Sequence, residues 1–537
     1  MMAFPLTLAH IFDRAGRLFP ESEIVARMPD KSLHRYRYAD FHRRAQSLVA
    51  ALRRMGLKRG ERVATLMWNH HAHLEAYFAV PCMGGVLHTL NLRLAPDDIA
   101  YIANHARDRF LIVDDVLLPL YDRIRAATHF EKTIVVPLSG APVPAGFEDY
   151  EKLVAGRRAV KLPRLREEAP AGMCYTSGTT GRPKGVVYTH RALVLHSLAS
   201  ALPDVMGMSN GDSVTPVVPM FHVNAWGIPF TAVMLGAKLA FPGPHLDPVS
   251  LLDLYQSEKV TLTAGVPTIW AGILEALDRE PGRWTLADGM RMVVGGAAAP
   301  ESMIRAFDRH RLKVIHGWGM TETTPVASVN YQKREITGQD ADAQYAFRAK
   351  QGVPLPFVEV RAMAGQGEAP WDGATLGELE VRGPWIAAGY HDLDSETDRW
   401  SADGWFRTGD VVTIDAHGYI KIADRIKDLV KSGGEWISSL DLENALVGHP
   451  KVAEAAVIAV PDAKWGERPL AVVVLKAGQS ATDAELREHL APRFAKFWLP
   501  DAFVFVDAIP RTSTGKMMKA KLREQFGGPP PDDAMTR

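Results

Sequence analysis

The sequence predicts an α/β protein with a large N-terminal domain of several subdomains, rich in parallel sheet, and a small C-terminal α+β domain. Single hydrophobic cores stop growing well below 537 residues, so we expect several folding units. Short apolar or β-branched runs alternate with helical patterns through the N-terminal part, which favours largely parallel sheets. Near residue 424 this pattern gives way to a charged stretch and then to a compact unit. We therefore expect an N-terminal domain over 1–423 and a C-terminal domain over 424–537.

Local patterns predict the elements of the N-terminal domain. Strand-like and helical segments alternate at 62–68, 74–80, 109–115, 117–127 and 132–138. The segment 191–202 carries Leu195, Leu198 and Leu202 at i, i+3 and i+7, a spacing that indicates an amphipathic helix.

Two later segments combine a strand with a turn. In 290–310 a buried-strand run leads into a Gly-rich turn and then a helix beside Pro300, and 313–323 begins as a strand and ends in a turn of small residues. The C-terminal domain contains short strand-like and helical segments at 440–450, 454–462, 469–476, 481–490 and 503–510.

The composition is that of an ordinary globular protein and gives no global charge. Lys plus Arg and Asp plus Glu each number 62, so no net field draws nucleic acid or an anionic membrane to the surface. Any anionic ligand must therefore be bound by a local site. The two cysteines, Cys82 and Cys174, suit a reducing compartment. With no recognisable signal peptide and no apolar run of about 18 residues, we expect a cytoplasmic protein without a transmembrane segment.

Three close histidines, His70, His71 and His73, invite a metal-site interpretation. Helical spacing could bring two of them together, but no second shell of acidic residues is evident. We favour surface or core positions for them.

The strongest local signal is the segment 175–190, which contains YTSGTTGRPKG. Four hydroxyl side chains, three glycines that let the backbone approach a polyanion, and one lysine favour a nucleotide triphosphate over a simple surface turn. These residues are Thr176, Ser177, Thr179, Thr180, Gly178, Gly181, Gly185 and Lys184. A P-loop requires Gly before the lysine and a hydroxyl residue after it, whereas Pro183 and Gly185 flank Lys184. The P-loop interpretation therefore fails.

This segment resembles the phosphate-loop signature of the adenylate-forming enzymes, which include acyl-CoA synthetases, luciferases and peptide-synthetase adenylation domains. Further motifs of that superfamily follow in order at 221–227, 294–300, 316–323, 405–410, 424–438 and 510–516. FHVNAW and DRIKDLVKSGGEWISSLDLENAL are most similar to bacterial medium- and long-chain fatty-acyl-CoA synthetases and methylmercaptopropionate-CoA ligases.

The resemblance implies a ligase that uses ATP and Mg²⁺ to form an acyl-adenylate and then transfers the acyl group to coenzyme A. It assigns Thr321 to the α-phosphate, Glu322 and Thr176 to Mg²⁺, and Lys184 to the phosphates. Lys516 matches the C-terminal lysine that reaches the carboxylate and the α-phosphate during adenylation. Lys519 and Lys521, in the same basic tail, are expected to be exposed.

The resemblance also places the nucleoside. Trp318, after Gly317, corresponds to the aromatic residue against adenine, although a plain core position would also explain a tryptophan. The other edge of the adenine is assigned to Gly295, Gly296 and Ala297, and the ribose to Asp410 with its partner Arg425.

Because Lys516 serves only the first half-reaction, the resemblance implies that the C-terminal domain rotates about a hinge near Lys427. Rotation would bring the segment 432–438 to the site, where Gly433 and Gly434 leave room for the pantetheine arm of coenzyme A. Trp465 and Glu467 resemble positions near coenzyme A, and Lys431 and Trp436 resemble positions on the nucleotide side. The resemblance also suggests a homodimer through the N-terminal domain.

The acyl pocket is assigned to His222, Val223 and Trp226, with Trp226 as a gate, and to a second wall at Gly265 and Pro267. Trp226 could also simply fill the pocket floor. Neither segment offers an ionic partner, which argues for an apolar acyl chain, such as a medium- or long-chain fatty acid. A short thioether acid (3-methylmercaptopropionate), an aryl or a branched acid remain alternatives. A non-catalytic acyl- or nucleotide-binding protein is opposed by the joint presence of Lys184, Glu322, Asp410 and Lys516.

Overall fold

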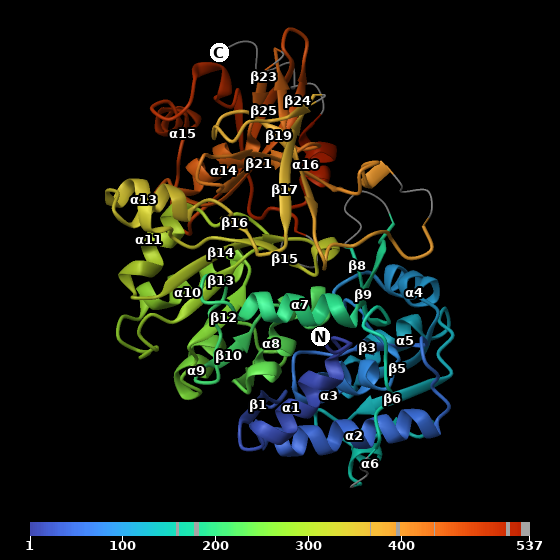
Figure 1. Ribbon diagram of the computed structural model, residues 1–537. Coiled ribbons are helices and arrows are strands. Elements are labelled where there is room, and N and C mark those ends of the chain that lie inside the picture. The colour runs from blue at the N-terminus through green and yellow to red at the C-terminus, as the bar shows by residue number, and fades with distance from the viewer. Residues whose placement is uncertain are drawn as a thin grey trace.

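The structure is a computed structural model of the chain. It describes residues 1–156, 160–176, 182–365, 367–393, 398–433, 435–511 and 516–527. Figure 1 shows the N-terminal elements as a broad lower body and the C-terminal elements as a smaller group above it. The α/β class predicted from the sequence is confirmed. No helix among the described residues is long and apolar enough to cross a membrane.

A seven-stranded sheet carries the predicted phosphate segment at its edge. The strand order is β7-β6-β5-β3-β4-β8-β9, parallel up to β8, with β9 antiparallel to β8. Its strands are β3 (Arg62–Leu66), β4 (Val86–Thr89), β5 (Asp108–Asp114), β6 (Lys132–Val136), β7 (Glu148–Asp149), β8 (Pro170–Tyr175) and β9 (Gly185–Thr189). The helices connected to these strands are α3 (His71–Cys82), α4 (Pro96–His105), α5 (Leu118–Arg125) and α6 (Tyr150–Val154). Apolar strand runs joined by helices explain the parallel pairing.

A nine-stranded sheet carries most of the other motifs. Its order is β16-β15-β14-β13-β12-β10-β11-β1-β2, parallel from β14 to β1 and antiparallel at both ends. The strands are β1 (Glu23–Arg27), β2 (Leu33–Arg37), β10 (Ser213–Pro216), β11 (Lys238–Phe241), β12 (Leu262–Gly265), β13 (Arg291–Val294), β14 (Lys313–Gly319), β15 (Val326–Val329) and β16 (Val353–Pro354).

Helices accompany this second sheet. They are α1 (Leu8–Leu18), α2 (Tyr38–Arg54), α7 (His190–Ala201), α8 (Ile228–Leu235), α9 (Pro248–Ser257), α10 (Pro267–Arg279), α11 (Glu301–Arg309), α12 (Arg334–Thr337) and α13 (Ala341–Arg348). One continuous core spans both sheets and includes Phe12, Phe41 and Phe78, whose rings pack against one another. Shared packing of this kind holds the two sheets in a fixed relation.

Two smaller sheets follow along the chain. The first is antiparallel and contains β17 (Glu359–Ala364), β18 (Gly367–Glu368), β19 (Gly377–Arg382), β20 (Phe406–Ile414) and β21 (Ile420–Arg425). The second contains β22 (Val430–Ser432), β23 (Glu435–Ile437), β24 (Val452–Asp462), β25 (Gly466–Leu475) and β26 (Ala502–Phe505), with helices α14 (Ser439–Val447), α15 (Asp483–Leu490) and α16 (Lys519–Phe526). The chain passes from one sheet to the other between Arg425 and Val430. The domain division at residue 424 stays a prediction.

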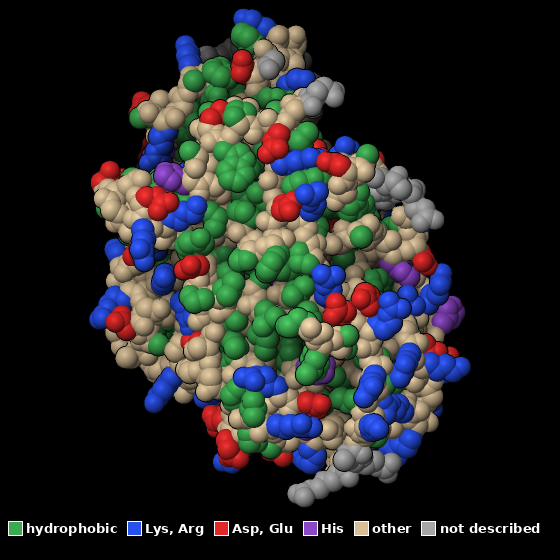
Figure 2. Space-filling model, viewed as in Figure 1, with side chains coloured by type: hydrophobic (Ala, Val, Ile, Leu, Met, Phe, Trp, Pro, Cys, Tyr) green, Lys and Arg blue, Asp and Glu red, His purple; other side chains and the backbone are tan. Residues whose placement is uncertain are grey.

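The helix expected over 191–202 forms, but its leucine stripe does not face the core. Leu195 is partly buried, whereas Leu198 and Leu202 are 48% and 40% exposed. The remaining sides of α7 are buried, so periodicity identified the helix and misassigned its inner face. In Figure 2 hydrophobic side chains gather at the centre of the visible face, where Figure 1 shows α7 and the N-terminus.

The expectation that Lys519 is exposed is wrong. Its ammonium lies 2.6 Å from Glu443 Oε1 and 2.5 Å from Ser439 Oγ, and its side chain is 11% exposed. Lys519 is the first residue of α16 and contacts α14, while Lys521 is exposed as expected.

The three close histidines are core residues, as favoured above. His70 Nε2 lies 2.8 Å from Asp114 Oδ1, and His73 Nε2 lies 2.9 Å from Thr65 Oγ1. Within the described parts of the chain no group of three or more His, Cys, Asp or Glu side chains could hold a metal ion.

Candidate active site

The predicted phosphate segment forms the turn of the β8–β9 hairpin. Tyr175 pairs with Gly185, the Thr176 N–H donates to the Lys184 carbonyl at 2.9 Å, and the Lys184 N–H donates to Thr176 Oγ1 at 3.1 Å. The hairpin is thus closed by backbone and hydroxyl contacts at the base of the loop. The predicted loop residues Ser177, Gly178, Thr179, Thr180 and Gly181 lie outside the described residues.

The turn after β14 meets this hairpin. The Tyr188 hydroxyl on β9 donates to the Thr321 carbonyl at 2.8 Å, and Glu322 follows in a short helical turn. The Tyr390 hydroxyl donates to Glu322 Oε1 at 2.6 Å, and the Lys184 ammonium lies 5.2 Å from the centroid of the Tyr390 ring. Lys184, Thr321 and Glu322, predicted separately from the sequence, therefore lie together.

The Glu322 carboxylate suits a magnesium ion bound through a nucleotide. It is 5% exposed, and among described side chains its hydrogen-bond partner is the Tyr390 hydroxyl on Oε1, which leaves Oε2 available. Mg²⁺ is typically held by one or two carboxylates together with substrate phosphates rather than by a protein cage. A single buried carboxylate beside a phosphate hairpin fits that pattern. Thr176 Oγ1 already accepts one hydrogen bond and retains a hydroxyl proton.

Asp410 anchors the opposite side of the site. Trp318 Nε1–H donates to Asp410 Oδ2 at 2.8 Å, and Arg425 Nε lies 2.5 Å from Asp410 Oδ1. Asp410 and Arg425 are also paired across β20 and β21. Trp318 and Asp410 are nearly buried, so the carboxylate is held by the indole N–H and by the charge of Arg425 rather than by solvent.

The glycines expected along the nucleotide border the acyl motif. A Cβ at Gly295 would lie 3.1 Å from Cη2 of Trp226 and 3.2 Å from the Gly317 carbonyl oxygen. Gly296 has φ of +79°, the left-handed region that favours glycine. Ala297 follows in the same turn after β13. The close approach of Trp226 therefore depends on the missing side chain at Gly295.

Lys516 lies part-buried among the charged groups of this site. Its electrostatic partners are Arg425, Asp410, Glu322 and Lys427. Burial, aided by the positive charges of Arg425 and Lys427 and opposed by the Asp410 and Glu322 carboxylates, lowers the Lys516 pKa to about 8. The C-terminal lysine is thus brought to the residues that the sequence assigned to adenylation.

The acyl motif contains a left-handed helical turn. Val223, Asn224, Ala225 and Trp226 have φ between 44° and 56°, and Gly227 continues with φ of 75°. Each non-glycine residue in this conformation costs about 1–2 kcal/mol, so surrounding packing must hold the turn. The turn buries Trp226 against the core. Burial and the nearby Lys516 charge lower the pKa of His222, which precedes the turn, to about 3, so its imidazole is neutral.

Gly265, predicted with Pro267 as the second wall of the acyl pocket, lies against Trp270 rather than Trp226. Gly265 ends β12, and a Cβ there would lie 2.8 Å from Cζ2 of the buried Trp270. Pro267 is the first residue of α10 and is partly exposed. Gly265 therefore faces the core beneath α10.

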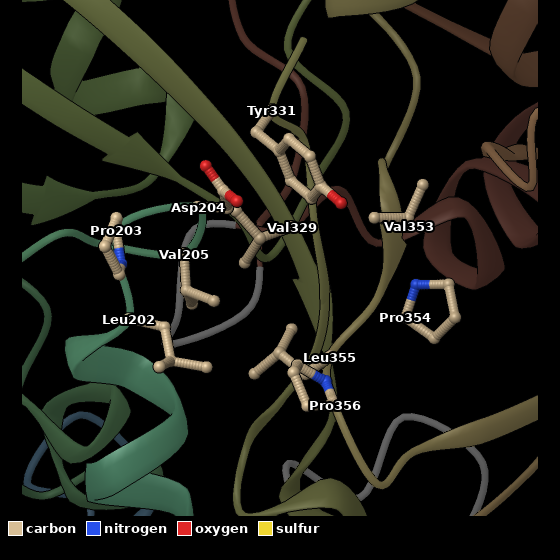
Figure 3. Close-up of a pocket in the computed structure, with 10 residues that line it drawn as sticks. All are labelled: Leu202, Pro203, Asp204, Val205, Val329, Tyr331, Val353, Pro354, Leu355 and Pro356. Atoms are coloured by element: carbon tan, nitrogen blue, oxygen red, sulfur yellow. The ribbon is translucent and has the colours of Figure 1, made fainter. Parts of the chain in front are cut away.

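A cavity of about 310 Å³ lies between the end of α7 and strands β15 and β16. Figure 3 shows its lining, which is apolar except for Asp204 and Tyr331 and consists of Leu202, Pro203, Asp204, Val205, Val329, Tyr331, Val353, Pro354, Leu355 and Pro356. None of the residues predicted for the acyl pocket lines it. A Cβ at Gly317 would lie 3.7 Å from Cγ2 of Val329, a residue that lines this cavity.

Gly433, Trp465 and Glu467, expected near coenzyme A, and Lys431 and Trp436, expected on the nucleotide side, lie together on the β22–β23 hairpin and around the β24–β25 turn. The Gly433 N–H donates to the Trp465 carbonyl at 2.7 Å, the Lys431 N–H donates to Glu467 Oε2 at 2.7 Å, and the Lys431 ammonium lies 5.3 Å from the Trp436 ring. Trp436 and Trp465 are 42% and 46% exposed. Gly434 lies outside the described residues. Lys427 is exposed at the crossing between the two small sheets.

Tyr390 is a site residue that sequence reasoning missed, as is Tyr188, which contacts the Thr321 carbonyl. Tyr390 lies 68 positions from Glu322 along the chain, in a connection between β19 and β20. Its neighbours in the sequence carry no chemical pattern, so only the tertiary structure reveals the contact.

Comparison with known proteins adds a family. The family model "AMP-binding enzyme" matches residues 12–391, and "AMP-binding enzyme C-terminal domain" matches residues 441–516. A long-chain-fatty-acid–CoA ligase of Thermus thermophilus is 50% identical over 529 residues, which cover 98% of this chain and 96% of the relative. A 3-methylmercaptopropionyl-CoA ligase of Ruegeria lacuscaerulensis is 43% identical over 535 residues, 98% of each chain.

Solved structures agree in fold over nearly the whole chain. The anthranilate CoA ligase AuaEII in complex with anthranoyl-AMP has a TM-score of 0.86 and 25% identity, with 98% of this chain and 99% of that chain covered. ATP-bound MatB from Rhodopseudomonas palustris has a TM-score of 0.81 and 27% identity, with the same coverage.

Proposed function

The chain belongs to the AMP-binding enzyme family, and from this premise we propose that it ligates a carboxylic acid to coenzyme A through an acyl-adenylate. ATP is the energy source, and AMP and pyrophosphate are the products besides the thioester. Two relatives that match nearly the full length are named CoA ligases, and a structural neighbour holds an acyl-adenylate analogue of this chemistry, anthranoyl-AMP.

One observation carries the proposal: groups from four distant motifs converge on one site. Lys184, Glu322 and Asp410 come from the phosphate hairpin, the turn after β14 and strand β20, and Lys516 comes from the C-terminal segment. A protein that only bound a nucleotide would need no lysine placed between the acidic groups. The arrangement favours catalysis over passive binding.

In the first step, a carboxylate oxygen of the acid attacks the α-phosphorus of ATP, and the bond to the bridging oxygen breaks to release pyrophosphate. Two anions must approach each other, so positive charge near the new bond lowers the barrier. Lys516 supplies that charge between the carboxylate and the α-phosphate, and Thr321 contacts the α-phosphate. Lys184 holds the departing phosphates beside the hairpin.

Mg²⁺, when bound, neutralises phosphate charge and orients the pyrophosphate. Glu322 would hold it through Oε2, with the Thr176 hydroxyl as a further contact. The Trp318–Asp410–Arg425 group would hold the nucleoside, since a carboxylate held by one hydrogen bond and one ion pair can still accept hydrogen bonds from the ribose hydroxyls. Gly295, Gly296, Ala297 and Gly317 would border the adenine.

In the second step, the coenzyme A sulfur attacks the acyl carbonyl carbon, the thiol proton is lost, and AMP leaves. We propose that the C-terminal part, 424–537, rotates about Lys427 between the two steps. The exposed surface formed by Lys431, Gly433, Trp436, Trp465 and Glu467 would then meet the adenylate. Its exposure while Lys516 faces Asp410 and Glu322 supports two alternating orientations.

The substrate we propose is a medium- or long-chain fatty acid. The turn that bears Trp226 and the cavity beside Val329 offer apolar surface. An apolar chain passing Trp226 could extend into this cavity. The alternative, 3-methylmercaptopropionate, is favoured by the Ruegeria relative and would need little of the cavity.

A substrate panel tests the proposal. Saturated acids from about C4 to C18, 3-methylmercaptopropionate, and aryl and branched acids are each incubated with ATP, Mg²⁺ and coenzyme A, and AMP and acyl-CoA are quantified. We expect equimolar AMP and acyl-CoA with an optimum among the longer unbranched acids. An optimum at the thioether acid would identify that acid, rather than a fatty acid, as the substrate. If no acid gave carboxylate-dependent AMP, a non-catalytic binding protein would be favoured.

The homodimer and the cytoplasmic setting are also proposals. Exposed apolar side chains on α7 and at the N-terminus, among them Leu198, Leu202 and Phe4, support an interface between copies of the N-terminal domain. Light scattering during gel filtration would give the mass of a dimer, and a monomer at micromolar concentration would contradict it.

Two buried thiols that form no disulfide, Cys82 and Cys174, are compatible with a reducing compartment.

A further inference from the structure

The segment from Ala387 to His391 connects two parts of the candidate active site. The Ala387 N–H donates to the Glu322 carbonyl at 2.8 Å, the Tyr390 hydroxyl donates to Glu322 Oε1 at 2.6 Å, and the His391 N–H donates to the Gly185 carbonyl at 2.8 Å. The segment therefore binds both the turn that carries Glu322 and the first residue of β9. It belongs to neither element.

The Tyr390 ring is itself held in place. Trp400 packs edge-on against it, with ring centroids 5.3 Å apart, and the Trp400 indole N–H donates to the Ala387 carbonyl at 2.8 Å. A ring fixed by an edge contact and by its hydroxyl has little rotational freedom. Its position relative to Glu322 is thus set by the fold.

The same ring lies beside the Lys184 ammonium, 5.2 Å from its centroid. A cation near an aromatic face is attracted by the ring without losing its charge. Tyr390 thus lies near two side chains of opposite charge, Glu322 at its hydroxyl and Lys184 at its ring. A direct ion pair between them would occupy the carboxylate needed for the metal and the ammonium needed for phosphate.

We propose that Tyr390 is a positioning residue for adenylation. Its hydroxyl fixes the Glu322 carboxylate and leaves one carboxylate oxygen for the metal, and its ring holds the Lys184 ammonium at the phosphate hairpin. This inference rests on the proposed function. It assigns two separable roles to one side chain, because the hydroxyl serves Glu322 and the ring serves Lys184.

Two variants separate these roles. Tyr390→Phe removes the hydroxyl and keeps the ring, whereas Tyr390→Leu removes both. Tyr121→Phe is the matched control, because the Tyr121 hydroxyl lies 3.0 Å from Thr133 Oγ1 on the far part of the seven-stranded sheet. Thermal midpoints would show whether each variant is folded.

The readout is binding rather than turnover. Mn²⁺ serves as a spin probe for the Mg²⁺ site, and electron paramagnetic resonance counts free Mn²⁺ in the presence of α,β-methylene ATP. Loss of a hydrogen-bond partner behind a metal ligand typically costs about 10–100-fold in metal affinity. We expect Tyr390→Phe to weaken Mn²⁺ binding about tenfold and to change metal-free analogue binding less than about twofold.

Tyr390→Leu should weaken both Mn²⁺ binding and metal-free analogue binding, because Lys184 also loses its support. All three variants should convert a supplied acyl-adenylate and coenzyme A to thioester at the wild-type rate, since that step uses neither metal nor the phosphate hairpin. Folded Tyr390→Phe protein with unchanged Mn²⁺ affinity would overturn the inference. Equal loss of both half-reactions in Tyr390→Phe would also overturn it, because it would indicate a purely structural role.

The outcomes distinguish this inference from the proposed function. If no acid supports AMP release but Tyr390→Phe still weakens Mn²⁺ binding tenfold, the proposed function fails and the positioning role stands. If the wild-type protein binds no Mn²⁺ with the analogue, the metal site and this inference both fail.

Discussion

The Lys516 ammonium is the group whose protonation should limit adenylation at alkaline pH. Its pKa is lowered to about 8, chiefly by burial and then by Arg425, although the carboxylates of Asp410 and Glu322 oppose the shift. The protonated form, which we propose stabilises the transition state, is therefore fully present well below pH 8 and is lost as the pH rises through 8.

We expect kcat/KM for ATP in adenylation to fall about tenfold per pH unit above that value, since kcat/KM reports the free enzyme. Lys516→Arg is the control, because a guanidinium keeps its charge throughout. If Lys516→Arg adenylates, its alkaline limb should disappear. If kcat/KM of that variant still fell above pH 8, the titrating group would be one other than Lys516.

At the residue scale, the sequence predicted identities better than contacts. Glu322, Asp410 and Lys516 could be singled out because each lies in a motif, and the motifs follow one another in the order found in the adenylate-forming enzymes. Tyr390 could not, since its contact with Glu322 spans 68 positions. Lys519 was misjudged for the same reason: its partner Glu443 lies in a different helix, α14, and a basic tail alone gives no sign of burial.

Among the elements, the left-handed turn of Val223–Gly227 should be sensitive to substitution. Gly227 has φ of 75°, and a Cβ there would lie 2.7 Å from Nδ1 of His196. His196 Nε2 accepts the Val326 N–H at 3.2 Å, so displacing the ring would leave a buried donor without its partner.

We expect Gly227→Ala to lower the thermal midpoint and to raise KM for the acid, because Trp226 is the preceding residue. Gly282→Ala is the matched control: Gly282 also has positive φ, of 81°, but a Cβ there meets nothing within 4 Å. The control should show only the conformational cost of about 1 kcal/mol. Equal midpoints for the two variants would contradict the clash with His196.

Helix α16 is held to α14 by a buried ion pair. The Lys519 ammonium contacts Glu443 Oε1 and Ser439 Oγ, and the Val457 N–H donates to the same Glu443 oxygen at 2.7 Å. Burial raises the Glu443 pKa to about 7 even though Lys519 opposes the shift. The carboxylate therefore depends on its partner to remain charged near neutral pH.

We expect Lys519→Met to destabilise the C-terminal part, by up to about 3–5 kcal/mol if Glu443 stays charged and by less if it takes a proton. The loss should be larger at pH 8.5 than at pH 6, since protonated Glu443 carries no unpaired charge. Thermal midpoints at both pH values would measure it, with the exposed Lys521→Met as control. A loss independent of pH would contradict the ion-pair account.

Periodicity predicted where elements lie and not which way they face. The helix over 191–202 forms, yet Leu198 and Leu202 point outward. Its other sides carry Leu193 and Val194 in the core and a buried His196 that bonds to Val326, so contacts from distant segments decide the inner face. A spacing of i, i+3 and i+7 cannot distinguish a core stripe from an exposed one.

At the scale of the whole molecule, the α/β architecture followed from the alternation of strand and helix patterns, and parallel sheets were confirmed. The convergence of the hairpin, the turn after β14, strand β20 and the C-terminal segment did not follow from any local pattern. This convergence arises because the sheet of β17–β21 lies between the N-terminal body and the C-terminal sheet and is linked to both along the chain (Figure 1).

The zero net charge of the chain affects how the molecule attracts its anionic substrates. With no net charge, the molecule has no overall field to attract ATP or coenzyme A. Local groups must therefore supply the binding energy: Lys184 and Lys516 at one site, and the exposed Lys431 beside Trp436 at the other. We propose that the two sites act in turn as the C-terminal part rotates.

The most direct test of this account is to measure the two half-reactions separately in Lys516→Ala, with the exposed Lys521→Ala as control. Carboxylate-dependent exchange of pyrophosphate into ATP reports adenylation, and conversion of a supplied acyl-adenylate to acyl-CoA reports the second step. We predict that Lys516→Ala loses exchange by at least about a hundredfold, the loss of one transition-state charge contact, and keeps thioester formation within about twofold of wild type. Equal loss of both half-reactions, or unchanged exchange, would contradict the account.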